Sequence, residues 1–165
     1  WMLLWGQFTV VAFLTGLAVA IFVTRVFRLP PVELSGRVNL WWGLIFMVEF
    51  LGALVVGSLT VAWQVYDVRR QPGAAIIAVP LCVDNDLIMT HTAVTCSLIP
   101  GSLFVDADRD RRILYLHVIG VRNAEDLERQ RASVLKWEQR IVKAVGSKEQ
   151  VLAVETGVPV TERAS

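Results

Sequence analysis

The chain has 165 residues and a formal net charge of +1, and 55% of its residues are apolar, against about 45–50% in a typical soluble domain. This length accommodates one modest domain with a hydrophobic core, or a smaller domain together with membrane helices. The charge is close to zero and the lysines form no run, so the composition gives no indication of nucleic-acid binding.

Charged side chains are rare in the first part of the sequence and frequent in the second. Up to residue 66 there are only five of them: Arg25, Arg28, Glu33, Arg37 and Glu49. This shift predicts a membrane region over residues 1–70, a water-exposed domain over residues 71–146 and a C-terminal tail over residues 147–165.

The first long apolar run covers residues 8–27 and reads FTVVAFLTGLAVAIFVTRVF. Its one charge, Arg25, lies near the end, where a long side chain can reach the membrane interface. The run therefore predicts a spanning helix. The WMLLWGQ segment before it suits an interface or the end of a preceding helix. The prolines and glycine of the following RLPPVELSGR stop the helix.

A second apolar run covers residues 39–66 and would be about 40 Å long as a helix. One face of it carries small or polar residues at three- and four-residue steps: Glu49, Gly52, Ala53, Gly57, Thr60, Gln64 and Asp67. In a spanning helix this stripe would be a helix-contact face, where Glu49 finds a donor or water. Alternatively, the helix lies in the membrane interface with the stripe toward water.

Arginines flank this second run on both sides, which bears on its orientation. Arg25, Arg28 and Arg37 precede it, and Arg69 and Arg70 follow it. Cytoplasmic segments next to membrane helices are enriched in arginine and lysine, yet a single spanning helix cannot place both groups on one side. Either the second run lies in the membrane plane or re-enters, or the connector before it departs from this rule because the larger domain dominates.

The water-exposed part predicts the order β-α-β-β-α. The segment AAIIAVPL reads as a strand, and one of Asp84, Asn85 and Asp86 caps a helix that ends near Leu98. Its predicted face consists of Leu87, His91, Val94 and Leu98. A hairpin of LFVDA and ILYLHVIGV follows, and a last helix runs from an Asn123 cap to Gly146.

The predicted fold class is therefore a membrane-anchored α+β protein, with about two N-terminal hydrophobic helices and a small domain whose helices cover one face of a sheet. The segment VLAVETGVPV in the tail could add an edge strand. Cys82 and Cys96 have no CxxC spacing and read as two free thiols in a reducing compartment, although pairing stays possible.

The water-exposed part shows no convincing active site. It lacks GxGxxG, Walker, HExxH and GxSxG motifs. The DADRD segment resembles a calcium loop, but Arg111 and His117 stand where that loop needs glycine and glutamate. His91 and His117 read as structural residues. We expect no enzyme activity, no catalytic residue, no cofactor and no metal.

One long stretch of the sequence is similar to a known protein family. It runs from RRQPGAAIIAVPL through THTAVTCSLIPGSLFVDADRDRRILYLHVIGV. It resembles the E subunit of the multisubunit cation/proton antiporters of the Mrp (Mnh) type, over about residues 49–146. The motif that carries it is a proline-glycine turn and a following strand, here Pro100, Gly101, Ser102, Tyr115 and His117. Ile99 stands where the family has a threonine, so that hydroxyl is absent.

The resemblance implies an accessory subunit of a sodium/proton antiporter complex in a bacterial or archaeal inner membrane, with its soluble domain in the cytoplasm. Its partners would be the other subunits and the lipid bilayer, and not nucleic acid. Glu49 alone cannot form a proton relay across ~30 Å of hydrocarbon, so we expect it to face neighbouring subunits. Candidates for an interface or ion path are Glu49, Gly52, Gly57, Thr60 and Gln64. The alternative function is a membrane-tethered module that senses a small ligand.

Overall fold

The computed structural model describes residues 1–6, 8–27, 38–66 and 73–157. They fall into two compact units, Trp1–Glu33 and Leu34–Ser165. The second apolar helix belongs to the same unit as the sheet, because it packs against a helix of the α+β domain. The predicted membrane region (1–70), water-exposed domain (71–146) and tail (147–165) stay predictions.

The first unit contains a short helix, α1 (Met2–Trp5), and a long one, α2 (Val10–Phe27). The indole Nε1 of Trp1 donates to Thr15 Oγ1 at 3.1 Å, which ties the start of the chain to α2. Thr15 and Thr24 also donate to carbonyls of the preceding turn, so these hydroxyls are satisfied within the helix. Helix α2 thus covers most of the first apolar run.

Helix α3 (Leu40–Tyr66) begins at Asn39, whose side-chain oxygen accepts from the backbone N–H of Trp41 at 3.1 Å and Trp42 at 3.4 Å. This cap sets the start of the helix at the beginning of the second apolar run. By length and composition, both α2 and α3 are long and apolar enough to cross a membrane. Asp67, the last residue of the predicted polar stripe, lies outside the described residues.

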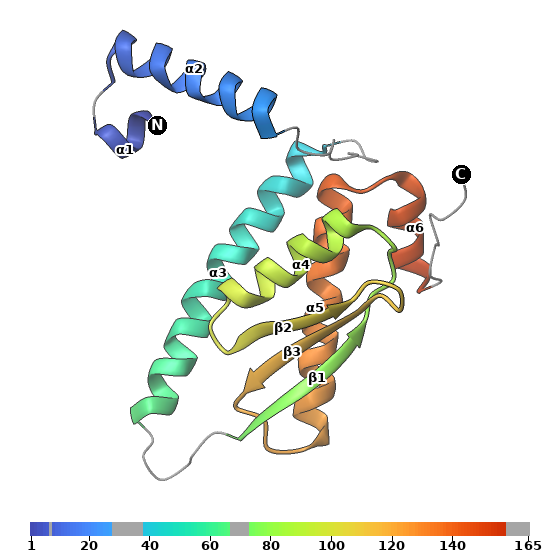
Figure 1. The fold of residues 1–165 in the computed structure, drawn as a ribbon. Coiled ribbons are helices and arrows are strands. Elements are labelled where there is room, and N and C mark those ends of the chain that lie inside the picture. Colours follow the sequence, from blue (N-terminus) through green and yellow to red (C-terminus); the bar gives the residue numbers. More distant parts are fainter. Residues whose placement is uncertain (7, 28–37, 67–72, 158–165) are drawn as a thin grey trace. The chain divides into compact units, whose positions relative to one another are not determined.

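The remaining order is β1 (Ala74–Pro80), α4 (Asp86–Leu98), β2 (Ser102–Asp108), β3 (Ile113–Ile119) and α5 (Ala124–Val145), as the sequence predicts. The strands form an antiparallel sheet in the order β1-β3-β2 (Figure 1). His117 of the central strand β3 is paired with Ile76 of β1 on one side and with Leu103 of β2 on the other. A bulge at Val105 separates the two halves of the β2–β3 pairing.

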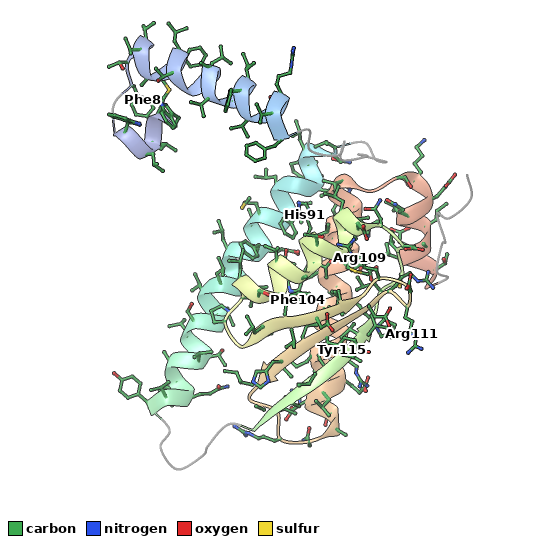
Figure 2. All side chains as sticks on the ribbon, viewed as in Figure 1. Phe8, His91, Phe104, Arg109, Arg111 and Tyr115 are labelled. Atoms are coloured by element: carbon green, nitrogen blue, oxygen red, sulfur yellow. The ribbon has the colours of Figure 1, made fainter. Side chains whose placement is uncertain are left out.

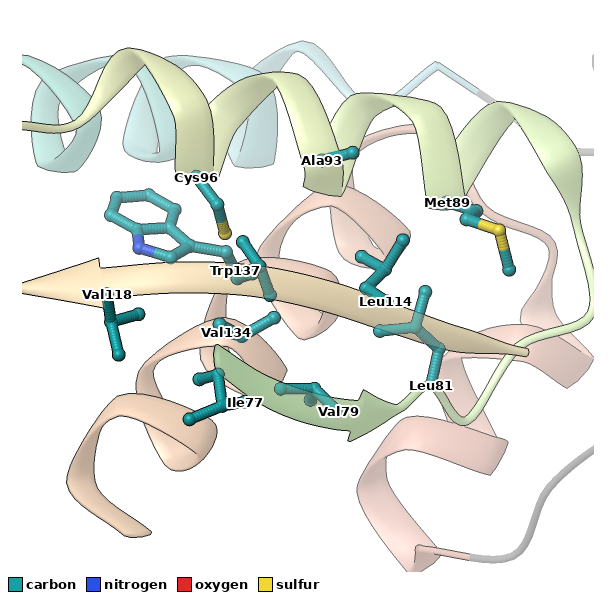
Figure 3. Packing of buried hydrophobic residues seen from close by; sticks show 11 residues of the cluster. Ile77, Val79, Leu81, Met89, Ala93, Cys96, Leu114, Val118, Val134 and Trp137 are labelled. Carbon is teal, nitrogen blue, oxygen red and sulfur yellow. The ribbon is translucent and has the colours of Figure 1, made fainter. Parts of the chain in front are cut away.

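The hydrophobic core lies between the sheet and the helices α4 and α5 (Figure 3). Side chains alternate along a strand, so every second residue of β3 is buried: Leu114, Leu116 and Val118. Trp137 of α5 is buried in the same cluster. The other face of the sheet carries Ile76, 66% exposed, and is not covered by α4 or α5.

Helix α4 buries a different face from the one predicted. Leu87 is only half-buried, His91, Val94 and Leu98 are exposed, and the buried residues are Ile88, Met89, Thr92, Ala93, Thr95 and Cys96. Both faces of this helix are apolar, so periodicity could not choose between them. Thr92 is buried because its hydroxyl donates to Ile88 O at 2.8 Å, which satisfies the polar group. His91 therefore points away from the core (Figure 2).

The predicted tail contains a helix, α6 (Lys148–Thr156), and not an edge strand over the described part of VLAVETGVPV. Ser147 and Gln150 form a capping box, in which each side chain accepts from the backbone N–H of the other residue. Two such bonds favour a helix start immediately after Gly146. Residues 158–165 of the predicted tail lie outside the described residues.

Polar residues fix the other helix starts and the hairpin turn. Asn85 caps α4, and Asn123 caps α5 by accepting from Asp126 N at 2.8 Å. The hairpin turn is closed by Asp108, which accepts from Arg111 N at 3.0 Å (Arg111 is labelled in Figure 2). Asp108 of the DADRD segment thus stabilises the hairpin turn through a local hydrogen bond.

Candidate functional site

One side of α3 packs against the α+β domain of the same chain along almost its whole length. We call this contact the α3 seam. The half-buried residues of α3 are Gly43, Ile45, Phe46, Glu49, Phe50, Ala53, Leu54, Gly57, Val61 and Gln64, and most of them follow one another at three- or four-residue steps along one side of the helix. The seam therefore uses much of the polar and small-residue stripe that the sequence indicates, and most of it faces α5.

Three aromatic rings form the centre of the seam. Phe46 and Phe50 stack with ring centroids 5.9 Å apart. The ring of Trp137 of α5 lies nearly perpendicular to both, with centroid separations of 5.8 Å to Phe46 and 6.3 Å to Phe50. Edge-to-face pairs of this kind contribute about 0.5–1.5 kcal/mol each beyond the area they bury. Trp137 thus connects α3 to the core of the α+β domain.

Glu49 forms an ion pair with Arg140 of α5. The guanidinium carbon of Arg140 also lies 4.7 Å from the centroid of the Trp137 ring, within cation–π range. The two charged side chains are 39% and 32% exposed. The acidic residue in the apolar helix therefore has a partner within its own chain, whereas the sequence suggested a neighbouring subunit.

Sequence reasoning did not identify Arg140. It lies far from Glu49 in the chain, among many charged residues of α5, and nothing in its local pattern distinguishes it. The available signal was indirect, because a lone carboxylate in an apolar helix requires a nearby cation or donor. Only the packing of α3 on α5 shows which cation that is.

The N-terminal end of the seam is also held by polar contacts. The backbone N–H of Asn39 donates to Ala144 O at 2.8 Å. The amino group of Lys143 lies 5.1 Å from the centroid of the Trp42 ring and pairs with Glu155 of α6 at 3.1 Å. A cavity of about 820 Å³ opens here between the start of α3 and helices α5 and α6.

At the other end, glycines allow close approach between α3 and the loops of the sheet. A Cβ at Gly57 would lie 3.0 Å from Pro100 O, and one at Gly120 would lie 2.9 Å from Gln64 Nε2. Gly57 and Gln64 are thus in contact with the domain. Thr60 is exposed and donates to Val56 O at 2.8 Å, although it borders a 280 Å³ cavity at this end.

Gly52 is a member of the predicted stripe that has open space around it. It is exposed, and a Cβ there would meet nothing within 4 Å. The five predicted interface or ion-path candidates are therefore not equivalent in the structure. Glu49, Gly57 and Gln64 contact the α+β domain, Thr60 borders the cavity beside it, and Gly52 has open space around it.

The Pro100-Gly101-Ser102 turn shapes the link between α4 and β2. Gly101 has φ +113°, a backbone conformation that residues with a side chain rarely adopt, and its carbonyl accepts from Ile119 N at 3.0 Å. Ser102 Oγ donates to Cys96 O at 2.6 Å and so ties the turn to the end of α4. This turn is what contacts Gly57 of the seam.

Two further residues of the family motif, Tyr115 and His117, lie away from the seam. They belong to the face of β3 that the helices leave uncovered, and each is half-buried (Tyr115 is labelled in Figure 2). Ile99, which replaces the expected threonine, packs against the core instead of offering a hydroxyl. The motif residues therefore do not gather into one site.

Next to Trp137 on α5, Glu138 is a buried carboxylate, 1% exposed. Its Oε1 accepts from the backbone N–H groups of Cys82 at 2.7 Å and Val83 at 2.9 Å. Burial raises the pKa of Glu138 to about 7, against the opposing effect of these two hydrogen bonds. Glu138 thus holds the segment that follows β1 against α5.

Cys82 and Cys96 are free thiols. Burial raises the pKa of Cys96 to about 12, and burial followed by the Glu138 carboxylate raises the pKa of Cys82. A thiol with a raised pKa carries little thiolate and is a poor nucleophile. Within the described ranges, no three His, Cys, Asp or Glu side chains are grouped so that they could hold a metal ion.

The alternative ligand-sensing function would require a space between helix and sheet. A cavity of about 370 Å³ lies between α4 and β2, lined largely by apolar residues such as Met89 and Phe104. Asp86 and Arg109, which form an exposed ion pair at 3.1 Å, border it (Figure 2 labels Phe104 and Arg109). This cavity is separate from the α3 seam.

The raised pKa of Glu138 predicts a pH-dependent stability. A carboxyl whose pKa is higher in the folded than in the unfolded state binds its proton more tightly when folded, and this binding stabilises the fold. For Glu138 the stabilisation is complete below the unfolded pKa of 4.5 and is lost as the pH rises through the folded pKa of about 7. Relative to Glu138→Gln, which keeps an acceptor but cannot ionise, the wild type should lose up to about 3 kcal/mol over that range. Thermal unfolding in mild detergent from pH 4.5 to 8 measures this difference, and parallel curves for the two proteins would contradict it.

The Glu49–Arg140 pair predicts an energetic coupling between the two residues. In a double-mutant cycle with Glu49→Gln and Arg140→Gln, we expect a coupling of about 1 kcal/mol, because each single change leaves a charge without its partner beside apolar surface. Unfolding of the four proteins in mild detergent gives this value. The matched control is the exposed Glu128–Arg131 pair on α5, for which we expect a coupling energy of only a few tenths of a kcal/mol. Equal couplings for both pairs would contradict the assignment.

Comparison with known proteins places these observations in a family. A family model described as Na⁺/H⁺ ion antiporter subunit (MNHE) matches residues 1–144. The chain is 28% identical over 130 residues to the E subunit of the Na⁺/H⁺ antiporter of Alkalihalophilus pseudofirmus OF4, covering 78% of this chain and 82% of that protein. It is 26% identical to the E subunit of a probable K⁺/H⁺ antiporter of Rhizobium meliloti 1021, covering 79% and 81%.

A third relative is the E subunit of the Na⁺/H⁺ antiporter of Bacillus subtilis 168, at 26% identity over 76% of this chain and 79% of that protein. Among solved structures, a chain of the Mrp complex from Dietzia sp. DQ12-45-1b is 18% identical, with a TM-score of 0.47, covering 61% of this chain and 92% of that one. The family model spans most of the sequence, including both apolar helices and nearly all of the α+β domain. The chain therefore belongs to the MNHE family of Na⁺/H⁺ ion antiporter subunits.

Proposed function

We propose that this chain is an accessory subunit of a cation/proton antiporter complex, which anchors and braces the assembly and does not itself carry the ion. Its partners are then the other subunits of the complex and the lipid bilayer. The family match and the three relatives named as E subunits of antiporters support this proposal. These are transporter subunits and not a family of catalytic enzymes.

The Glu49–Arg140 ion pair is the observation that carries the proposal. Glu49 is the only acidic residue in α2 or α3, and its carboxylate is already paired with a cation of the same chain. Proton transfer across ~30 Å of hydrocarbon requires a series of ionisable groups at short intervals. One engaged carboxylate cannot supply such a series, so the ion path belongs to other subunits.

The α+β domain lies on the cytoplasmic side in this proposal. Two observations support that side. Arginine is concentrated around the apolar segments at Arg25, Arg28, Arg37, Arg69 and Arg70, as in cytoplasmic flanks. Cys82 and Cys96 are free, which suits a reducing compartment.

The relatives are named for different cations, Na⁺ in two cases and K⁺ in one. A subunit that holds no ion itself can serve either exchange. This agrees with a bracing role, since the α3 seam uses its charged and aromatic groups to fix α3 to the domain. Ion choice is then a property of the subunits that form the path.

A second candidate function, sensing of a small ligand, is favoured by the 370 Å³ cavity between α4 and β2. We would expect a ligand there to be mainly apolar, with one polar group near the Asp86–Arg109 pair. Saturable binding of such a compound by the purified chain, lost on Ala93→Trp, which fills the cavity, would support this function. Binding that survives this change would place the ligand elsewhere.

Deletion of the chain from the host tests the proposal. Loss of the assembled complex on native gels, together with loss of growth in sodium at alkaline pH, is the expected result. A complex that assembles and supports normal growth without this chain would contradict it.

The Glu49→Gln variant separates bracing from ion transfer. If Glu49 serves the seam, antiport activity in everted vesicles should fall at most a few-fold and in proportion to the amount of complex. The matched variant Arg140→Gln should behave alike, because both break the same pair. Complete loss of antiport in a fully assembled Glu49→Gln complex would instead assign Glu49 to the ion path.

A further inference from the structure

We propose that α3 lies in the plane of the membrane surface, with its apolar face in the lipid, and does not cross the bilayer. This inference concerns how the chain meets the membrane and holds whether or not the bracing role is correct. It rests on the contacts of the α3 seam and on the chemistry of the opposite face of the helix.

The first step is the length of the seam. Contacts to the α+β domain begin at Asn39, which donates to Ala144 O, and extend to Gln64, which lies against Gly120. At 1.5 Å per residue this distance is about 37 Å, longer than the ~30 Å hydrocarbon core. The domain therefore accompanies α3 along the whole distance that a spanning helix would occupy.

The second step is the composition of that domain next to the seam. Lys143 and Glu155 lie beside the start of α3, Arg140 lies at its middle, and Asp126 and Arg129 border the cavity at its end. If α3 crossed the bilayer with the seam intact, these groups would enter hydrocarbon, at a cost of several kcal/mol for each charge. The seam and a spanning orientation therefore exclude each other.

The third step is the exposed face of α3, which covers about half of the helix circumference. It carries long aliphatic side chains that are 50–66% exposed: Leu44, Met47, Val48, Leu51, Val55, Val56 and Leu59. The one charge of the helix, Glu49, is on the seam. The exposed side of α3 is therefore largely apolar, and the opposite side contacts protein that carries charged side chains. An apolar side toward lipid and a contact with water-exposed protein on the other side are compatible with a position in the membrane interface.

The fourth step is the position of aromatic and basic residues. Trp41 and Trp63 are 68% and 76% exposed, and indole rings favour the headgroup level, which an in-plane helix occupies along its whole length. Lys148 lines the cavity beside Trp41, so a cation is placed where it can meet the phosphate of an anionic lipid. An in-plane helix also removes the conflict between the arginine clusters, because both can lie on one side.

These features favour lipid over a helix of another subunit as the occupant of the exposed face. Close helix packing within a membrane uses small residues. Gly43, Ala53 and Gly57 of α3 lie on the seam, whereas Gly52 and Ser58 are exposed among long aliphatic side chains. The exposed face presents branched and long side chains that suit acyl chains. The apolar helix α2 remains as the candidate for a span.

Cysteine labelling in intact cells and in everted vesicles tests the orientation. In a parent with Cys82→Ala and Cys96→Ala, single cysteines at Val38 and Tyr66 mark the two ends of α3, and Thr90→Cys marks the α+β domain. With an impermeant maleimide, we expect all three to label from the same side. Opposite labelling of the Val38 and Tyr66 positions would overturn the proposal.

A depth measurement on the purified full chain covers the case in which a cysteine variant is not labelled. Spin labels at Leu44, Leu51 and Leu59, in vesicles of phosphatidylethanolamine and phosphatidylglycerol, should lie at one common depth of about 5–10 Å below the phosphates. A spanning helix would place the Leu51 label several ångströms deeper than the other two. Labels that stay accessible to a water-soluble relaxation agent would show that the face awaits a protein partner. Either of these results would overturn the proposal.

Discussion

A single carboxylate in an apolar helix has to be neutralised, and the way this chain does so determines much of its architecture. Glu49 pairs with Arg140 of α5, and the same guanidinium lies over Trp137, which packs against Phe46 and Phe50. The pair thus brings together the apolar helix and the core of the α+β domain. With these contacts, α3 and the sheet belong to one compact unit.

Much of the fold could be predicted from the sequence, because caps and turn residues mark the ends of its elements. Asn85 and Asn123 start their helices where the pattern indicates, and the β-α-β-β-α order is confirmed. The buried face of α4 could not be predicted from the sequence, because both of its faces are apolar. The structure places Thr92 on the buried face, where its hydroxyl donates to a carbonyl of the same helix. The capping box of Ser147 and Gln150 was readable in the tail, but a β-branched stretch nearby favoured a strand.

Only one side of the candidate site, the stripe on α3, could be predicted from the sequence. The stripe on α3 could be recognised from its spacing, whereas its partner could not, because the pairing of Glu49 with Arg140 depends on how two distant helices pack. The same holds for Glu138, whose burial and bonds to Cys82 and Val83 follow from tertiary structure alone. The family, in contrast, was recognisable from the Pro100-Gly101-Ser102 turn, which the structure places against Gly57 of α3.

Helix α5 contacts two different parts of the molecule through adjacent residues. Trp137 touches the aromatic pair of α3, and Glu138 binds the backbone that leads from β1 to α4. These neighbours on one rigid rod cannot move independently. The packing of α3 and the position of the segment at Cys82 therefore both depend on the same turn of α5.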